Sequence, residues 1–550
     1  DPSVPFAAVD EARFEFAWRR DEGRYIVSRL LLRGGETHLA LSTDGRRNWR
    51  LHQPEDRGPG HFLFLAFEPH DIHLSFTHPG LGLVFHGAAS DAAAAATTSH
   101  DGDALTTRVR FDGNVRGVAY KGETLTGPEL TFRDTGRWFP LRGGVEVAGV
   151  RLDLDGRVAD LLRAVMIDAD ATLAGRSLAA LQPILGDRYL SPRAIRASGR
   201  LRVEAGRVSL AAAKASVGGT DLTGDLAWSK GDGRKSVQAH LQSDHADAAD
   251  LLWLTGRDDA ASAGRDVAES ARAKPPAITT RLSRSVPAPL ATAAAAAGPD
   301  AFAAARELEA EIAFEARHFH LAAWQQVQSL KLVARLHDRQ LAVSDLDVGW
   351  ADGHSNGRIT LDLRQPLAVA EAQVTTRGVR VESLLHAAEA RNRITGALAG
   401  TFRLKASGAD VAALRANASG NAAFSVRGGT ISSLLDAELG LEGGKLIRTV
   451  LSGAEPLALP CAAADIELRN GHAALRGLVI DSANTRTTGS GVIDLRERTI
   501  DLVLTPAPKQ SGFLQLSRSI HLHGHLPKPE RSLIERVAQP AASGCAGAPS

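Results

Sequence analysis

Three patterns of reactive side chains could give this chain a chemistry. The sharpest is GHSNG at residues 353–357, which fits the G-x-S-x-G motif of hydrolases and would make Ser355 a nucleophile. That motif needs a strand before the serine and a helix after it. Here an alternating segment, RITLDL, follows the serine. The sequence therefore favours a β-turn at this place over a nucleophile.

Histidines and carboxylates form the two weaker patterns. His521, His523 and His525 alternate along one segment, and a strand with this spacing can offer imidazoles to zinc or copper. No cysteine or cluster of carboxylates completes such a site, so neither a metal nor another cofactor is predicted. Asp494 and Asp501 would need to meet in a cleft to act as glycosidase acids. Neither has a recognisable acid–base partner, and we predict that the chain is not an enzyme.

The chain holds two cysteines, Cys461 and Cys545. Such a pair either stays reduced or forms one disulfide in an oxidising compartment. A Cys461–Cys545 disulfide would hold the Pro-, Ala- and Gly-rich tail after Val537 against the last strands. No C-x-x-C spacing occurs, so a redox or metal role is not predicted for either residue.

The elements around these residues show the period of β-strands. From residue 461 to 527, short alternating segments are separated by turn residues such as Asn470 and Gly471, which is typical of an antiparallel meander. The same block of strand, turn and strand begins at Gly206, at Arg339 and at Gly471. Repeated units stack by sharing a face with their neighbours, so a long chain needs no larger core.

Apolar residues in the last segment fall on a single face of each strand. Since side chains alternate across a strand, this face would be dry and the opposite face wet. The candidate lining residues of this apolar face are Ile466, Leu468, Leu478, Ile480, Ile500, Leu502 and Leu504. The pattern leaves open whether these faces close on a sandwich or solenoid core or form an open trough.

Composition excludes some classes of partner. Lys and Arg number 64 against 63 Asp and Glu, giving a formal net charge of +1 with both signs interspersed. No basic stripe carries interleaved aromatic residues, so nucleic acid is not a predicted partner. Aromatic residues make up only 5%, and the apolar surface must come from aliphatic side chains spread along strands. No run of apolar residues is long enough for a membrane-spanning helix.

Breaks in the alternation predict the domain organisation. Residues 257–305 carry Pro, Ser and Ala runs without a sustained period, which is typical of a disordered linker. Short helices are predicted around Leu161, around Leu178 and from Ile431, where they would cap an open sheet end. The predicted parts are an N-terminal strand region at 1–87, a central β-repeat region at 105–256, the linker, a C-terminal β-repeat domain at 306–527 and a flexible tail at 528–550.

Several segments, in this order, resemble the AsmA family of envelope proteins in Gram-negative bacteria. The segment LLLRGGETHLALSTDGRRNWRL, with Asn48 and Trp49, is similar to the family's N-terminal signature, and VGGTDLTGDLAW is similar to its central repeats. The segments GNAAFSVRGGTISSLL, GSGVIDL and IHLHGHLPKPE, together with Cys461, resemble its C-terminal domain. The family is related to repeating β-groove lipid-transfer proteins. The resemblance therefore implies a mainly β fold, an elongated and curved antiparallel sheet of groove-forming repeats with a few short capping helices.

The resemblance also implies a function in the periplasm. Phospholipid acyl chains would lie along the apolar groove, and the protein would support outer-membrane biogenesis and lipid homeostasis without performing chemistry. An inner-membrane helix would precede Asp1, so we expect the membrane anchor to be missing from this chain. The alternative is a non-enzymatic scaffold that influences outer-membrane protein assembly through outer-membrane assembly components. An open apolar trough would favour lipid, and closed sheets would favour the scaffold.

Overall fold

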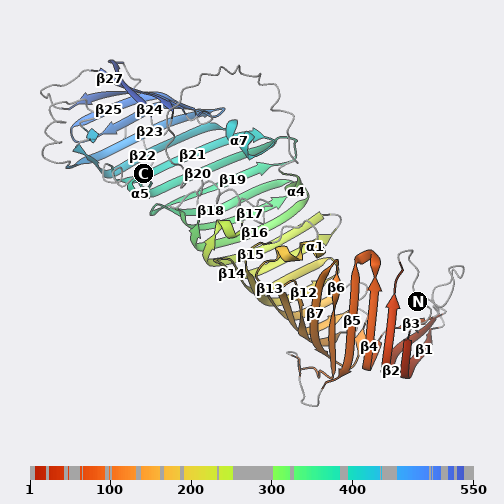
Figure 1. The fold of residues 1–550 in the computed structure, drawn as a ribbon. Coiled ribbons are helices and arrows are strands. Elements are labelled where there is room, and N and C mark those ends of the chain that lie inside the picture. The colour runs from red at the N-terminus through yellow and green to blue at the C-terminus, as the bar shows by residue number, and fades with distance from the viewer. Residues whose placement is uncertain are drawn as a thin grey trace, which may run out of the picture. The chain divides into compact units, whose positions relative to one another are not determined.

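The fold is mainly β, as predicted, with long and mostly antiparallel strands and only short helices (Figure 1). The computed structural model describes residues 7–19, 24–42, 48, 62–64, 66–92, 98–99, 102–131, 138–160, 166–185, 191–231, 234–251, 302–321, 327–384, 394–433, 435–436, 455–494, 497, 499–509, 518–525 and 529–537. The chain divides into two compact units. Unit 1 takes in the described residues up to 231 and from 238 to 251, and unit 2 takes in 234–237 and those from 302 onward.

Unit 1 begins with the one described place where strands run parallel. Its first strands are β1 (Ala7–Arg19), β2 (Arg24–Ala40), β3 (Phe62–Phe64) and β4 (Ala66–His78). Strands β1 and β2 form an antiparallel pair, whereas β2 runs parallel to β3 and β4. A parallel pair cannot be joined by a tight turn and needs a longer connection.

The rest of unit 1 is antiparallel. The strands are β5 (Leu83–Asp91), β6 (Thr107–Val115), β7 (Val118–Thr126), β8 (Leu130–Thr131), β9 (Phe139–Val147), β10 (Val150–Ala159), β11 (Met166–Gly175), β12 (Ile195–Glu204), β13 (Arg207–Val217), β14 (Thr220–Gly231) and β15 (Arg234–Asp247). Each pairs with the next along the chain as far as β14, except that β8 pairs with β4 and β7 pairs directly with β9. Strand β15 is divided between the two units.

Unit 2 is a further antiparallel meander, visible in green to blue in Figure 1. Each strand pairs with the next along the chain. The strands are β16 (Leu308–His320), β17 (Val327–His337), β18 (Gln340–Trp350), β19 (Gly353–Asp362), β20 (Ala368–Arg380), β21 (Ala397–Gly408), β22 (Ser419–Ser432), β23 (Pro456–Arg469), β24 (His472–Asp481), β25 (Thr485–Asp494), β26 (Thr499–Pro508), β27 (Arg518–His525) and β28 (Glu530–Glu535).

Two-residue turns join several of these strands. Asn470 and Gly471, predicted as turn residues, connect β23 to β24 with φ of 49° and 82°. Arg116 and Gly117 do the same between β6 and β7, with φ of 51° and 80°. Two successive residues at positive φ form the type I′ turn, whose twist matches that of the flanking strands.

The described helices lie at strand ends. They are η1 (Pro79–Leu81), η2 (Ala179–Leu181), α1 (Gln182–Leu185), α2 (Ala248–Leu251), α4 (Ala303–Arg306), α5 (Val381–Leu384) and α7 (Val411–Ala416). Helix α7, for example, packs Ala413 and Leu414 against Gly408, the last residue of β21. The predicted helix around Leu178 is confirmed as η2 and α1. No helix in the described ranges is both long and apolar enough to cross a membrane.

The repeated block found in the sequence recurs as one structural unit. In β13 the register with β14 shifts between Leu210 and Ala213, and in β18 the register with β19 shifts between Val343 and Leu346. Strand β24 shifts against β25 between Leu475 and Leu478. Each shift is a β-bulge that begins after the fourth residue of its strand, and a bulge bends the strand and increases its twist.

On the partner strand, a glycine lies opposite the first residue after each bulge. Gly224 faces Ala213, Gly357 faces Leu346 and Gly489 faces Leu478, so the equivalent glycine of the last block is Gly489 rather than Gly491. A Cβ at Gly224 would lie 1.8 Å from the carbonyl oxygen of His240, and one at Gly357 would lie 2.3 Å from that of Gln373. The missing side chain therefore lets neighbouring backbones approach at the bend.

Three predicted boundaries need correction. The helix expected around Leu161 is a strand from Met166 onward, because Ile167, Ala169 and their partners alternate with polar residues and pair with β10 and β12. Residues 530–535, assigned to the flexible tail, form β28 and pair with β27. Ile431 and Ser432, where a helix was expected, still belong to β22. The linker predicted at 257–305 lies, except for its last four residues, outside the described residues.

Candidate functional site

The cross-strand register brings the seven predicted lining residues onto one face of unit 2. Residues directly opposite each other on neighbouring strands point to the same side of a sheet. Ile466 lies opposite Leu475, which faces Gly491, which in turn faces Leu502. Leu478 and Leu504 both lie opposite Gly489, and Ile480 lies opposite Thr487. Leu468 lies opposite Ala473, which faces Ile493, and Ile493 lies opposite Ile500, so Leu468 and Ile500 are on the same face.

Burial divides these seven residues into two groups. Leu502 and Leu504 are only 8% and 6% exposed. Leu504 forms a small core with Ile520, against which Leu478 and Leu522 pack. Leu502 and Leu504 are therefore covered in this structure, and their role as lining residues stays a prediction. Ile466, Leu468, Leu478, Ile480 and Ile500 are half-buried.

An equivalent face in unit 1 is more open, and none of the lining residues predicted from the sequence lies on it. It runs through Val145, Leu152 and Leu173 on β9 to β11 and through Leu201, Leu210 and Leu226 on β12 to β14. Leu226 and Trp228 are 43% and 38% exposed, although both share this apolar face with Leu222 and Gly224. The signal was present, since the block GRVSLAAAKASVGGTDLTGDLAW alternates as the last segment does.

Small residues follow one row across this face. Ala171 lies opposite Leu154 on one side and Gly199 on the other, and Ala213 lies opposite Gly224. Larger aliphatic residues, such as Leu173 and Leu222, lie in the next row.

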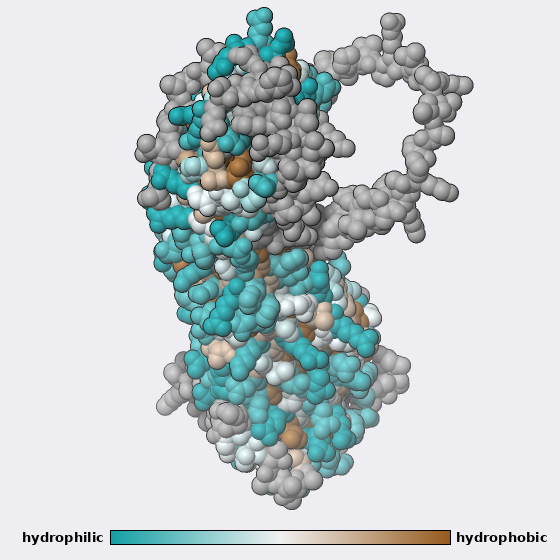
Figure 2. Space-filling view, turned by 90° about the vertical axis from the view of Figure 1, so that its left-hand side faces the viewer, coloured by the Kyte–Doolittle hydropathy of each residue, from teal (hydrophilic) through white to brown (hydrophobic). Residues whose placement is uncertain are grey.

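The opposite face is polar and held by ion pairs between strands. Asp168 on β11 lies 2.7 Å from the guanidinium of Arg200 and 3.3 Å from that of Arg157. Partial burial would raise the pKa of Asp168, but the hydrogen bonds and charge of Arg200, with help from Arg157 and Arg202, outweigh it and lower the pKa. Figure 2 shows one side of the molecule, on which hydrophilic residues predominate and hydrophobic residues lie in small separate groups. The strands are thus amphipathic, with one wet and one apolar face.

The reactive patterns serve structure. Ser355 is buried near the start of β19 rather than in the expected β-turn, and its hydroxyl accepts from Trp350 Nε1 at 2.7 Å and bonds the Thr376 hydroxyl at 2.7 Å. No helix follows it, so the hydrolase interpretation does not fit. Asp494 pairs with His472 at 3.0 Å and Asp501 with His521 at 2.9 Å. In the part of the chain that the structure describes, no three His, Cys, Asp or Glu side chains are grouped to hold a metal ion.

One of the two cysteines, Cys461, lies within the described residues. Cys461 lies buried in β23, and it is not a free thiol. Cys545 lies outside the described residues, so its pairing with Cys461 stays a prediction.

Comparison with known proteins agrees with this geometry. The model of the AsmA family matches residues 203–478, which is half of the chain. The chain is similar to the AsmA family protein YhjG of Escherichia coli (strain K12), with 24% identity over 440 residues that cover 77% of this chain and 62% of the relative. It therefore spans less than two thirds of that relative's length. No solved structure matches the chain. A mainly β chain of amphipathic, repeated hairpins that matches the family model over half its length belongs to the AsmA family.

Proposed function

We propose that this member of an envelope-associated family carries phospholipid acyl chains along the apolar faces of its sheets, in the periplasm, and so supports outer-membrane lipid homeostasis. One observation carries the proposal. Leu226 and Trp228 stay more than a third exposed on a face that they share with apolar residues such as Leu201, Leu210 and Leu222, and large apolar groups exposed to water on a continuous face mark a binding surface.

The chemistry of the face suits an acyl chain. Rows such as Val145, Leu152 and Leu173 are aliphatic and offer no polar group to a ligand. Each methylene moved from water onto such a surface contributes about 0.8 kcal/mol. Affinity would then come from chain burial, with the headgroup left in water and little selection among headgroups.

The oxidised state of Cys461 supports a location in the periplasm. Cys461 is not a free thiol, and oxidised cysteines persist in the periplasm but not in the reducing cytosol. We propose that the chain works on the periplasmic side of the inner membrane, to which a helix outside this sequence would anchor it.

Mass spectrometry of lipid extracted from the purified protein tests the proposal, with a detergent-free preparation and a soluble control protein treated alike. We expect phospholipid in stoichiometric amounts. A photoreactive residue in place of Leu222, on the apolar face, should crosslink to acyl chains, whereas the same residue at the neighbouring Thr223, on the polar face, should not. Lipid no higher than in the control would overturn the proposal and favour a scaffold for outer-membrane assembly components.

A further inference from the structure

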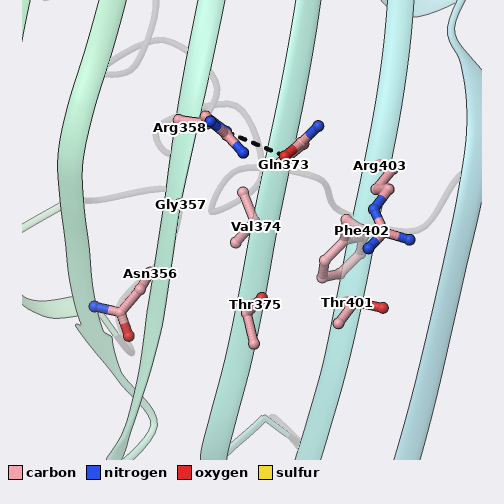
Figure 3. Close-up of a pocket in the computed structure, with 9 residues that line it drawn as sticks. All are labelled: Asn356, Gly357, Arg358, Gln373, Val374, Thr375, Thr401, Phe402 and Arg403. Atoms are coloured by element: carbon pink, nitrogen blue, oxygen red, sulfur yellow. Dashed lines mark hydrogen bonds between the residues drawn. The ribbon is translucent and has the colours of Figure 1, made fainter. Parts of the chain in front are cut away.

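Unit 2 has a shallow depression on its polar face that the lipid proposal does not use. Its volume is about 310 Å³, and it lies across three neighbouring strands, β19, β20 and β21. Figure 3 shows the residues that line it, which are Asn356, Gly357, Arg358, Gln373, Val374, Thr375, Thr401, Phe402 and Arg403. A second depression of about 310 Å³ shares Thr401 and Arg403 with it.

Two cross-strand rows give the depression its shape. Arg358, Gln373 and Arg403 lie opposite one another in one row, and Asn356, Thr375 and Thr401 form the next. The long side chains of the first row rise beside the short hydroxyl side chains of the second (Figure 3). The hollow is therefore bordered by guanidinium and amide groups on one side, and by two hydroxyl groups and the amide of Asn356 on the other.

The first row carries two arginines without an acidic partner. Some neighbouring basic residues on this polar face are neutralised, as Lys405 is by Glu371 at 2.8 Å and Arg476 by Glu467 at 2.6 Å. Arg358 donates instead to the neutral carbonyl oxygen of Gln373, at 3.1 Å. No carboxylate of the described residues forms an ion pair with Arg358 or Arg403.

The row consequently presents donors and positive charge without a counter-charge. Because Gln373 Oε1 accepts from Arg358, its amide nitrogen is left to donate. The two arginines stand two strand spacings apart, about 10 Å at the backbone. Acids around the row are already engaged. On the adjoining strand, Asp347 accepts hydrogen bonds from Asn356 at 2.8 Å and His354 at 3.0 Å. Glu467, which lines the second depression together with Arg403, pairs with Arg476.

From this arrangement we propose that the depression binds a phosphate group. Arginine forks match the oxygens of phosphate and carboxylate. Two forks, one amide and two hydroxyl groups offer more donors than the two oxygens of a carboxylate can accept, whereas a phosphate presents three or four oxygens. The phosphate could belong to a lipid headgroup at a membrane surface or be free in solution, and the chemistry of recognition is the same.

The site is separate from the acyl-chain face. Val374 and Phe402 belong to the apolar face through Ala422 and Ile466, whereas Arg358 and Arg403 project from the other side of the same strands. A lipid held on the apolar face cannot place its headgroup in this depression. The two proposals therefore fail or succeed independently.

Binding measurements on the full chain test this proposal. Calorimetry with inorganic phosphate and flotation with phosphatidylglycerol vesicles, against phosphatidylcholine vesicles, separate the two sources. Arg358→Gln and Arg403→Gln each remove one charge and should weaken binding about tenfold. The matched control is Lys405→Gln on the same face and strand as Arg403, which should leave binding within about twofold because its charge is already paired.

Either source supports the proposal when the arginine variants and the control behave in this way. Binding of inorganic phosphate assigns the depression to a free phosphate group, and binding of the anionic vesicles alone assigns it to headgroups at a membrane. Absence of binding in both experiments, or an equal loss in Lys405→Gln, would overturn it. Unchanged far-ultraviolet circular dichroism of each variant shows that the fold is intact.

Discussion

Single glycines decide how closely the strands of this protein can approach. Gly357 faces Leu346, the first residue after the bulge in β18, and its missing Cβ leaves room for the carbonyl oxygen of Gln373. Gly231, by contrast, has open space where a Cβ would be and lies at the end of β14. Substitution of these two glycines should therefore change the free energy of unfolding by different amounts, although both lie in strands.

We expect Gly357→Ala to lower the free energy of unfolding by about 2 kcal/mol, because β20 must shift to relieve the clash. Gly231→Ala should change it by less than about 0.5 kcal/mol. Urea unfolding followed by circular dichroism measures both. Equal effects of the two variants would contradict a packing role for Gly357.

Asp168 makes stability depend on pH. Its pKa is lowered in the folded state by Arg200, Arg157 and Arg202, so its contribution is present above the unfolded pKa of about 3.9 and is lost as the pH falls through the lower folded value. Asp168→Asn should cost about 1 kcal/mol at neutral pH, and the difference from wild type should shrink below about pH 4. Urea midpoints across this range check the sign; a difference that grows on acidification would refute it.

The faces of individual residues were predictable from the sequence, and their burial was not. Alternation correctly placed Ile466 with Leu468 and Leu478 with Ile480, because a strand has period two. Leu475 was missed since the bulge at residues 476–477 puts it on the same face as Leu478, three residues away. The closure of the face over Leu504 depends on Ile520 and Leu522, which come from another strand. No local pattern carries that information.

At the scale of elements, short helices fasten the ends of hairpins. Asp250 of α2 is buried, and its carboxylate accepts from the backbone amides of Gly219 and Thr220 at 2.7 and 3.1 Å in the turn between β13 and β14. Arg193 lies 2.8 Å away and balances the charge. The helix therefore holds a turn that belongs to a neighbouring hairpin.

Asp250→Asn should loosen that turn, because an amide oxygen is a weaker acceptor and leaves Arg193 without a counter-charge. We expect hydrogen exchange of the Gly219 and Thr220 amides to accelerate about thirtyfold, equivalent to about 2 kcal/mol. Asp225→Asn is the control in the same hairpin, since Asp225 instead accepts from Ala212 at 2.9 Å. Unchanged exchange at Gly219 in Asp250→Asn would show that the carboxylate does not hold the turn.

Strands in which polar and apolar residues alternate strictly were predicted well. Segments in which helix propensity competes with this alternation were not. The turn at Asn470–Gly471 was predicted because this dipeptide favours positive φ at both positions. The helix expected around Leu161 rested on Leu and Ala residues with good helix propensity. Pairing with two neighbouring strands outweighed that propensity from Met166 onward, since tertiary context overrides a weak local preference.

At the scale of the whole molecule, each unit carries an apolar face of its own. Leu173→Glu would place a charge on the face of unit 1, where burying it beside an acyl chain is costly. Lipid crosslinking from a photoreactive residue at Leu222 should then fall at least about fivefold, and crosslinking from Leu404 in unit 2 should stay within about twofold. An equal loss at both positions would contradict separate binding faces.

The equal offset of the bulges from the start of their strands has a consequence for how such a molecule can change in size. A hairpin that brings its own bulge and its own opposing glycine adds two strands, about 9.6 Å of sheet, and keeps the apolar side chains on the same side. Gain or loss of one hairpin therefore alters the length of the apolar surface and leaves its chemistry and its curvature per repeat unchanged. The length of the apolar surface therefore changes in steps of one whole hairpin.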